Sequence, residues 1–325
     1  MNADNGAGPL DALGGATGWL NSSSLGQPDL RYRVVLVEFW TYTCINWLRC
    51  LPYTRAWAGR YRKHGLVVIG VHAPEFGFEA DRGNVRRAAR ELRVDYPIAI
   101  DNDYAIWNAF DNRYWPARYL LDARHRIRHH HFGEGDFEGS ERVIQRLVGE
   151  AGAEGVGRDL VEVAAHGIEA AADWAGIGTP ETYLGYLRTE NFASAGGPVP
   201  DRPHAYAVPA RLRLNQWALD GEWTAQQEAV LVGRAGGRIA CRFHARDLHL
   251  VMAPPVPGAS GDFRVRIDGE PPGAAHGGDV DSDGNGTVTA PRLYQLIRQP
   301  GPIAERTFEI TFADAGVRAY AFTFG

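Results

Sequence analysis

The segment at residues 34–53, VVLVEFWTYTCINWLRCLPY, constrains the fold of this chain more than any other stretch. Its first seven residues are almost all apolar, β-branched or aromatic, which predicts a strand buried on both faces of a sheet. A helix pattern follows from Cys44 and contains Pro52. Unpaired N–H groups and the helix dipole favour the thiolate of a cysteine at a helix N-terminus. Cys44 is therefore a candidate nucleophile, and an inert buried cysteine is the alternative.

The first 150 residues alternate between strand and helix patterns. Strands alternating with helices predict an α/β domain with some parallel strand pairing. We expect strands at 34–40, 66–72, 97–101, 117–122 and 126–132, and helices at 44–63, 81–93, 103–110 and 138–149.

The rest of the chain has a different pattern. Residues 151–205 are rich in Ala, Gly and Pro and predict a linker that packs partly on the surface. From residue 206 to 325, apolar and polar residues alternate in several short runs, as at Ile239, Cys241 and Phe243. This period-2 alternation between Gly/Pro turns predicts antiparallel strands in a second, all-β sandwich domain.

Composition excludes several classes of protein. The 325 residues have a net charge of -5, which argues against a nucleic-acid-binding surface. No stretch approaches the roughly 20 apolar residues of a membrane span, and the N-terminus lacks the pattern of a signal peptide. We expect a cytoplasmic protein that is not embedded in a membrane, with an extracytoplasmic fragment as the alternative. Three cysteines do not make a disulfide framework.

Three segments, FWTYTCIN, the LPY that follows it and RIRHHHFGEG, resemble the thioredoxin superfamily, in particular TlpA-like proteins and the C-terminal region of DipZ-type proteins. The resemblance covers nearly the whole chain. It implies a thioredoxin-like domain followed by a β-sandwich similar to a carbohydrate-binding module. It also implies thiol-disulfide exchange with protein thiols or disulfides and no cofactor, with a glycan as a possible ligand of the second domain.

The resemblance assigns roles to four residues. Cys44 matches the attacking cysteine, and Glu38 the buried acid that manages the proton of a second cysteine. Pro52 matches the proline that kinks the active-site helix, and Pro116 the cis-proline facing the thiol. From the residues alone, Glu38 could equally be a paired core acid, Pro52 a simple kink and Pro116 a trans proline of an edge strand.

Trp47 is where the sequence departs from this pattern, because the family has its second cysteine there. Without that cysteine, a mixed disulfide on Cys44 would persist until an outside thiol, such as a small-molecule donor, released it. Two hypotheses follow: a single-cysteine thiol-disulfide oxidoreductase, or a redox-inactive protein that binds peptide or glycan. We expect Trp40, Trp47 and Trp115 to contact the substrate, although simple packing of Trp47 is the simpler explanation.

The other cysteines offer little support for a dithiol site. Cys50 lies six residues beyond Cys44, about 9 Å along a regular helix, whereas a disulfide needs Cα atoms within about 7 Å. Cys241 shares a strand face with apolar neighbours and is expected in the core.

A peroxiredoxin-like thiol peroxidase is a minor alternative, since Thr41 precedes Cys44 by three residues and Arg118 could steady a peroxide.

Two further motifs suggest metal sites, although we expect no metal at either. Side chains alternate faces on a strand, so the run His129–His131 cannot converge on one ion and predicts a solvated edge. Asp279, Asp281 and Asp283 resemble the start of a calcium loop, but Ala290 stands where an EF-hand has Glu. An acidic hairpin turn is the simpler interpretation.

The aromatic residues of the second domain could stack on sugars, but core packing is commoner; these are Trp217, Trp223 and Tyr294.

Overall fold

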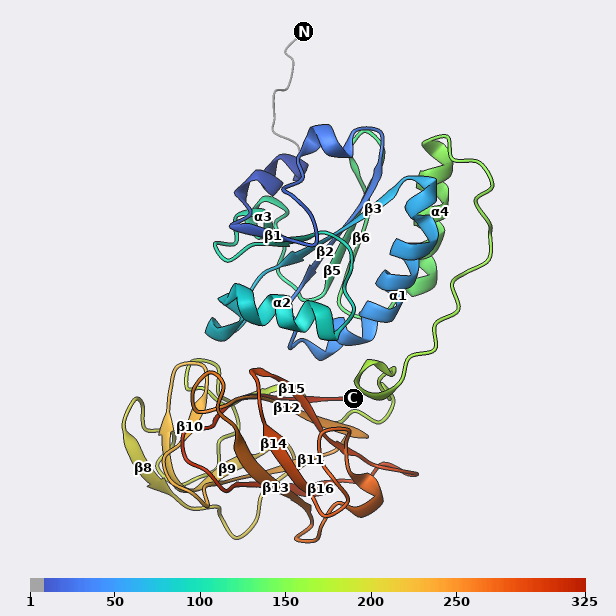
Figure 1. Ribbon diagram of the computed structural model, residues 1–325. Helices are drawn as coiled ribbons and strands as arrows, with labels where there is room; N and C mark the ends of the chain where they lie inside the picture. The colour runs from blue at the N-terminus through green and yellow to red at the C-terminus, as the bar shows by residue number, and fades with distance from the viewer. Residues whose placement is uncertain (1–8) are drawn as a thin grey trace. The chain divides into compact units, whose positions relative to one another are not determined.

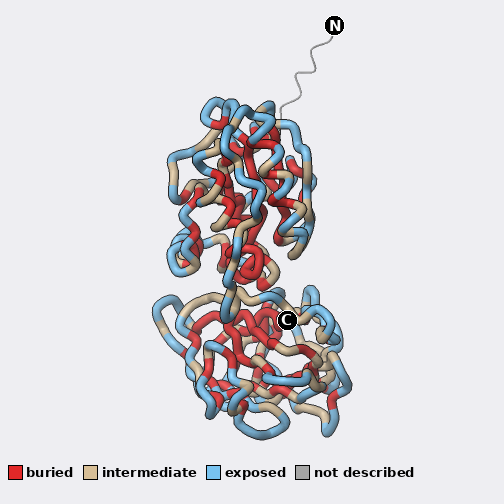
Figure 2. The backbone as a smooth tube through the Cα atoms, turned by 90° about the vertical axis from the view of Figure 1, so that its right-hand side faces the viewer, coloured by how far each residue is buried: buried red, intermediate tan, exposed pale blue. Residues whose placement is uncertain are grey.

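The computed structural model describes residues 9–325, which form two compact units, one ending at Glu169 and the other covering Ala170–Gly325 (Figure 1). Each unit has its own buried centre (Figure 2). The first is an α/β unit and the second is all β, as the sequence predicts. Among the described residues, no helix combines the length and the apolar character needed to cross a membrane.

The first unit is built on a six-stranded sheet with the order β1-β4-β3-β2-β5-β6. β2 pairs in parallel with β3, and β3 with β4, whereas β1, β5 and β6 pair antiparallel to their neighbours. The strands are β1 (Gly18–Leu20), β2 (Val34–Trp40), β3 (Leu66–His72), β4 (Ile98–Ile100), β5 (Ala117–Leu121) and β6 (Ile127–Phe132). The helices are α1 (Ile45–Tyr61), α2 (Arg82–Glu91), α3 (Ala105–Ala109) and α4 (Phe137–Glu150).

Both faces of this sheet are covered, which is why β2 is buried at every position. The odd-numbered residues of β2 pack with α3 and with the 3₁₀ helix η1 (Pro9–Gly15). The even-numbered residue Glu38 faces α1 instead. α1 lies beside α4 (Figure 1), because Trp57 and Tyr61 of α1 both donate hydrogen bonds to Glu141 of α4. This arrangement places the start of α1 at the carboxyl end of the central strand.

The expected elements of the first unit agree with the observed ones to within a few residues. The strands expected at 34–40 and 66–72 have those bounds in the structure. The boundary between the two units falls after Glu169, within the segment 151–205 that the sequence predicts as a linker. The later part of that segment contains β7 (Thr182–Tyr183) and β8 (Pro203–Tyr206), which pair with β17 and β9 of the second unit.

The second unit folds one hydrogen-bonded path of strands into two layers around a shared core. The path runs β14-β13-β16-β11-β9-β10-β17-β12-β15. The strands are β9 (Trp217–Ala225), β10 (Val230–Val232), β11 (Arg238–Phe243), β12 (Asp247–Ala253), β13 (Gly261–Ile267), β14 (Asn285–Val288), β15 (Arg292–Arg298), β16 (Arg306–Phe312) and β17 (Arg318–Phe324). Cys241 lies in the core with Ile239 and Phe243, as their shared strand face predicts.

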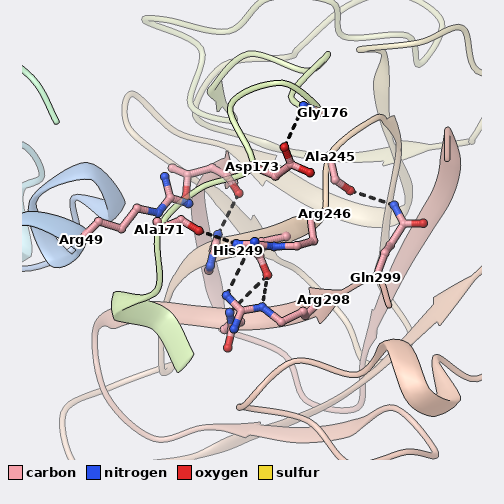
Figure 3. A network of polar contacts seen from close by, with 12 residues as sticks. Arg49, Ala171, Asp173, Gly176, Ala245, Arg246, His249, Arg298 and Gln299 are labelled. Carbon is pink, nitrogen blue, oxygen red and sulfur yellow. Dashed lines mark hydrogen bonds and ion pairs between the residues drawn. The ribbon is translucent and has the colours of Figure 1, made fainter. Parts of the chain in front are cut away.

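A buried ion cluster closes one edge of this sandwich. Asp247 is 1% exposed, and its carboxylate accepts hydrogen bonds from Arg246 and from Arg298. Arg246 also donates to the carbonyl of Ala171 (Figure 3). The backbone of Asp247 pairs with Gly325 through both its N–H and its carbonyl. The cluster therefore ties β12, β15 and the end of β17 together.

Candidate functional site

Cys44 is the N-cap residue of α1 and is half-buried. Its carbonyl accepts the first helical hydrogen bond, from the N–H of Leu48, at 3.0 Å. The N–H groups of the first helical turn point toward the N-cap, where the dipole favours negative charge. The strand-turn-helix pattern at residues 34–53 therefore produces the local geometry expected of a reactive thiol.

The loop before β5 faces this thiol. The Trp115–Pro116 peptide bond is cis, and the carbonyl oxygen of Trp115 lies 3.6 Å from the Sγ of Cys44. Trp115 is held by a hydrogen bond from its indole N–H to the carbonyl of Ala73, and its ring packs against Trp107 at 4.4 Å. The resemblance placed Pro116 opposite Cys44; in the structure the bond before Pro116 is cis, and the carbonyl of Trp115 lies beside the thiol.

Glu38 is completely buried behind α1, and its carboxylate accepts hydrogen bonds from three side chains. Thr54 donates to Oε1 at 2.7 Å, while the indole of Trp47 and the hydroxyl of Tyr96 donate to Oε2 at 3.1 and 3.3 Å. Burial raises the pKa of Glu38, and the hydrogen bonds from Thr54 and Trp47 oppose that rise. The acid is thus hydrogen-bonded to Trp47, the position at which the resemblance led us to expect a second cysteine.

Two of the three tryptophans expected to contact substrate lie elsewhere. Trp40 and Trp47 are 0% exposed and stack on each other, with ring centroids 4.2 Å apart. They differ from the expectation because β2 is covered on both faces and the Trp47 side chain turns inward to reach Glu38. Their contacts are with each other, with His72 and with Glu38, and of the three tryptophans Trp115 alone is partly accessible.

Cys50 and Arg118 are both buried in the first unit. Cys50 is buried and carries a thiol, and burial raises its pKa to about 12. Arg118 is 1% exposed, and its guanidinium lies over the rings of Trp57 and Phe137. The raised pKa disfavours the Cys50 thiolate that a resolving role would need, and the contacts of the Arg118 guanidinium are with buried rings.

The two metal-like motifs have other hydrogen-bonding roles. His129 and His131 lie on one face of β6 within ion-pair distance of Asp136, and His130 packs against Tyr119 on the other face. Asp281 accepts hydrogen bonds from the N–H groups of Asp283 and Asn285 and so closes a turn. Asp279 pairs with Arg292. No group of three potential metal ligands is found among residues 9–325.

The aromatic residues considered for sugar stacking are core residues. Trp217, Trp223 and Tyr294 are each 1% exposed or less. The indole N–H of Trp217 and that of Trp223 donate to backbone carbonyls, and the hydroxyl of Tyr294 donates to the carbonyl of Ala290. Their polar atoms are therefore satisfied inside the sandwich.

The structure shows a second buried acid beside the site, Glu79, which the sequence analysis did not identify. It is 0% exposed and accepts a hydrogen bond from the hydroxyl of Thr43, the residue directly before Cys44, at 2.6 Å. A local signal existed: Glu79 follows Phe76 by three residues in PEFGFE, the spacing at which a carboxylate caps the N-terminus of a short helix. The contact with Thr43 had no such signal, since 36 residues separate the two.

The fold and the Cys44 turn together define a thioredoxin-like protein with an appended β-sandwich. Residues 179–325 match the family model described as the thioredoxin-like C-terminal domain. Over 333 aligned positions that cover this whole chain, protein DipZ of Mycobacterium bovis is 33% identical. The chain spans 45% of the length of that relative.

The first unit has relatives of its own. The thiol-disulfide oxidoreductase YkuV of Bacillus subtilis is 28% identical over 142 residues, which are 44% of this chain and 95% of that protein. A solved thioredoxin-like protein in its oxidised form is 28% identical, covers 44% of this chain and 96% of its own, and superposes with a TM-score of 0.41. The chain is a homologue of DipZ and of the TlpA-like thiol-disulfide oxidoreductases.

Proposed function

We propose that this protein carries out thiol-disulfide exchange with Cys44 as its single reactive cysteine. The observation that carries the proposal is the placement of Cys44 at the start of α1, with its Sγ 3.6 Å from the carbonyl of Trp115 and with Trp47, rather than a thiol, on Glu38. The identity of the chain to YkuV, named a thiol-disulfide oxidoreductase, supports the reaction type.

The reaction is balanced by an external thiol. The Cys44 thiolate attacks a substrate disulfide, forming a mixed disulfide and releasing one substrate thiolate. A small thiol then attacks, which releases the second substrate thiol and leaves Cys44 joined to the small thiol. A second small thiol restores Cys44 and leaves as the oxidised dimer. The net result is one substrate disulfide reduced and two small thiols oxidised.

Three residues take part in this reaction, one as the nucleophile and two as the border of the substrate site. Cys44 is the nucleophile, and the backbone of Trp115 and Pro116 borders the site where a substrate chain would lie. Glu38 has a different role from that of an acid beside a second thiol, because its Oε2 is occupied by the indole of Trp47. We assign it to holding α1 against β2 through Trp47 and Thr54.

The proposal is tested by assaying reduction of a disulfide-bonded peptide by the wild type, Cys44→Ser and Trp47→Cys. Each is given glutathione or, separately, dithiothreitol, and folding is checked by near-UV circular dichroism. We expect the wild type to work with glutathione and Cys44→Ser to lose at least about 100-fold of the rate. A wild type no faster than Cys44→Ser, with activity gained in Trp47→Cys, would replace the proposal with a redox-inactive binding protein.

One observation favours that binding function as the second candidate. A hollow of about 900 Å³ lies on the polar face of β13, β14 and β16 in the second unit. Its lining includes Arg264 and Arg266 on one strand face, together with Asp262 and Thr287. Charged and hydroxyl groups of this kind bind polar ligands such as glycans. Glycan-array binding by the wild type that disappears in Arg264→Ala would support it.

A further inference from the structure

Glu79 is a buried ionisable group that the exchange reaction above does not use. It lies in the 3₁₀ helix η4 (Gly77–Ala80), which follows β3. Its Oε1 accepts a hydrogen bond from the hydroxyl of Thr43 at 2.6 Å. Its Oε2 accepts from the backbone N–H of Glu75 at 2.6 Å and from that of Phe76 at 3.0 Å. One carboxyl group therefore joins the β3–η4 loop to the residue directly before the nucleophile.

A second contact holds the same loop and turn together. The ring of Tyr42, two residues before Cys44, packs between the ring of His72 at 5.7 Å and that of Phe78 at 6.2 Å. Tyr42 and Thr43 thus both attach the Cys44 turn to residues 72–79.

All three hydrogen bonds suit the ionised form of Glu79, because a carboxylate only accepts. A protonated carboxyl must donate from one oxygen, and both backbone N–H groups at Oε2 are donors themselves. The proton therefore belongs on Oε1, where the Thr43 hydroxyl reverses its role and accepts. Protonation turns the Thr43 hydroxyl while keeping the same two residues in contact.

The surroundings of Glu79 bring this change close to neutral pH. Burial raises the pKa of Glu79 to about 7, the hydrogen bonds from Thr43 and from the Phe76 N–H oppose that rise, and the charge of Glu75 adds to it. His72 on β3 stays neutral in this range, since burial lowers its pKa to about 3. Glu79 is therefore the buried group of this loop whose charge changes around neutrality.

We propose that Glu79 is a positioning residue for Cys44, acting through Thr43, and that its change of protonation state makes the reactivity of the Cys44 thiol depend on pH. The inference rests on the proposed function in that Cys44 is the reactive group, and it adds a regulating residue to that site. Ionised Glu79 places a negative charge against Thr43, the residue directly before Cys44, and a nearby negative charge disfavours the thiolate.

The test is the rate of alkylation of Cys44 by iodoacetamide from pH 5.5 to 9 in the full chain. Cys50 and Cys241 are buried, and Cys44→Ser supplies the background. We expect two inflections in the wild type, one of them near pH 7. Glu79→Gln keeps a group of the same shape without the charge, and should show one inflection and react about 3-fold faster at pH 8.

Thr43 supplies the matched pair of variants. Thr43→Ser keeps the hydroxyl and should keep both inflections, whereas Thr43→Val removes the hydroxyl and should lose the one near pH 7. A role confined to folding would not separate these two. A ¹³C-glutamate NMR titration of the wild type, which needs no variant, should show a buried carboxyl titrating together with the change in the alkylation rate.

The outcomes separate this inference from the proposed function. If Cys44 reacts but Glu79→Gln has the wild-type pH profile, the Glu79 inference is wrong and the exchange function stands. If the NMR titration shows no buried carboxyl changing with the alkylation rate, the inference is wrong as well. If Cys44→Ser is labelled as fast as the wild type, Cys44 is unreactive and both proposals fail.

Discussion

The indole N–H of Trp47 satisfies an oxygen of Glu38 that would otherwise lose a donor in a fully buried site. A buried carboxylate without such partners costs several kcal/mol, so each of its donors contributes to folding. The Trp40–Trp47 stack adds packing to the same contact. Trp47 therefore contributes to the stability of the fold around Glu38.

Trp47→Phe tests this contribution. The substitution keeps an aromatic ring but removes the donor to Oε2 of Glu38, leaving Tyr96 as the donor at that oxygen. We expect the free energy of unfolding to fall by about 1–3 kcal/mol. Thr54→Val, which removes the donor to Oε1, is the matched control and should cost a similar amount. Urea unfolding that leaves both variants as stable as the wild type would contradict this account.

Glu79 also predicts how stability depends on pH. Its pKa rises from its ordinary value of 4.5 to about 7 on folding, so the folded state binds more protons between those values. The stabilisation is complete below pH 4.5 and is lost as the pH rises through 7, by up to about 3 kcal/mol. Glu79→Gln removes this slope. The difference in unfolding free energy between wild type and variant, measured at pH 5 and pH 8, should shift in favour of the variant at pH 8.

At Gly70 the backbone of β3 lies close to two buried aromatic side chains. β3 passes so near the Trp40 side chain that a Cβ at Gly70 would lie 2.7 Å from Nε1 of Trp40 and 3.0 Å from a ring carbon of Tyr96. A glycine in the middle of a strand ordinarily weakens it. Here the missing side chain lets β3 lie against the Trp40 ring, which stacks on Trp47.

Gly70→Ala should therefore destabilise the first unit by about 2–3 kcal/mol, because the two rings beside it are buried and cannot easily move. Gly59→Ala in α1 is the control with the opposite expected sign. Gly59 is exposed, and a Cβ there meets nothing within 4 Å. The Gly59→Ala substitution should therefore raise the free energy of unfolding by about 0.5–1 kcal/mol. Thermal unfolding compares the two, and equal shifts would show that the close approach at Gly70 is unimportant.

At the scale of the molecule, each unit is stabilised by a buried core of its own. The second unit adds an ionic contact to its apolar core. Burial opposes the ionisation of Asp247, but hydrogen bonds from Arg298 and Arg246 outweigh it and hold its pKa below the ordinary value. Its contribution to stability is therefore present above pH 4 and is lost as the pH falls below that value.

Asp247→Asn should loosen the second unit selectively. Removing one charge of a buried cluster leaves two arginines poorly compensated, at a cost of about 3 kcal/mol or roughly 100-fold in the opening equilibrium. Hydrogen exchange read by mass spectrometry should show faster exchange in β12, β15 and β17, with β2 and β3 unchanged. Glu222→Gln, which removes a more exposed ion pair with Arg234, should have little effect. Uniform acceleration in both units would contradict the division.

The sequence predicted the strands and helices of the first unit more completely than it predicted the contacts of the Cys44 site. Residues 34–40 and 66–72 are recognisable as strands because their apolar, β-branched character is local. The burial of Trp40 was not recognised and packing of Trp47 was one of two explanations, since aromatic residues next to a candidate nucleophile serve equally well in a groove or in a core. The strands at 182–183 and 203–206 were missed, because each is short and exists through pairing with β17 or β9.

Periodicity and local chemistry sufficed for the α/β-then-β order, the strand before Cys44 and the thiol at a helix start, since neighbours in the chain create all three. Contacts between distant residues required the folded molecule. Trp115 approaches Cys44 across 71 positions, and Glu79 reaches Thr43 across 36. These pairings depend on how β2, β3 and β5 align in one sheet, and strand register is set by the packing of both faces together.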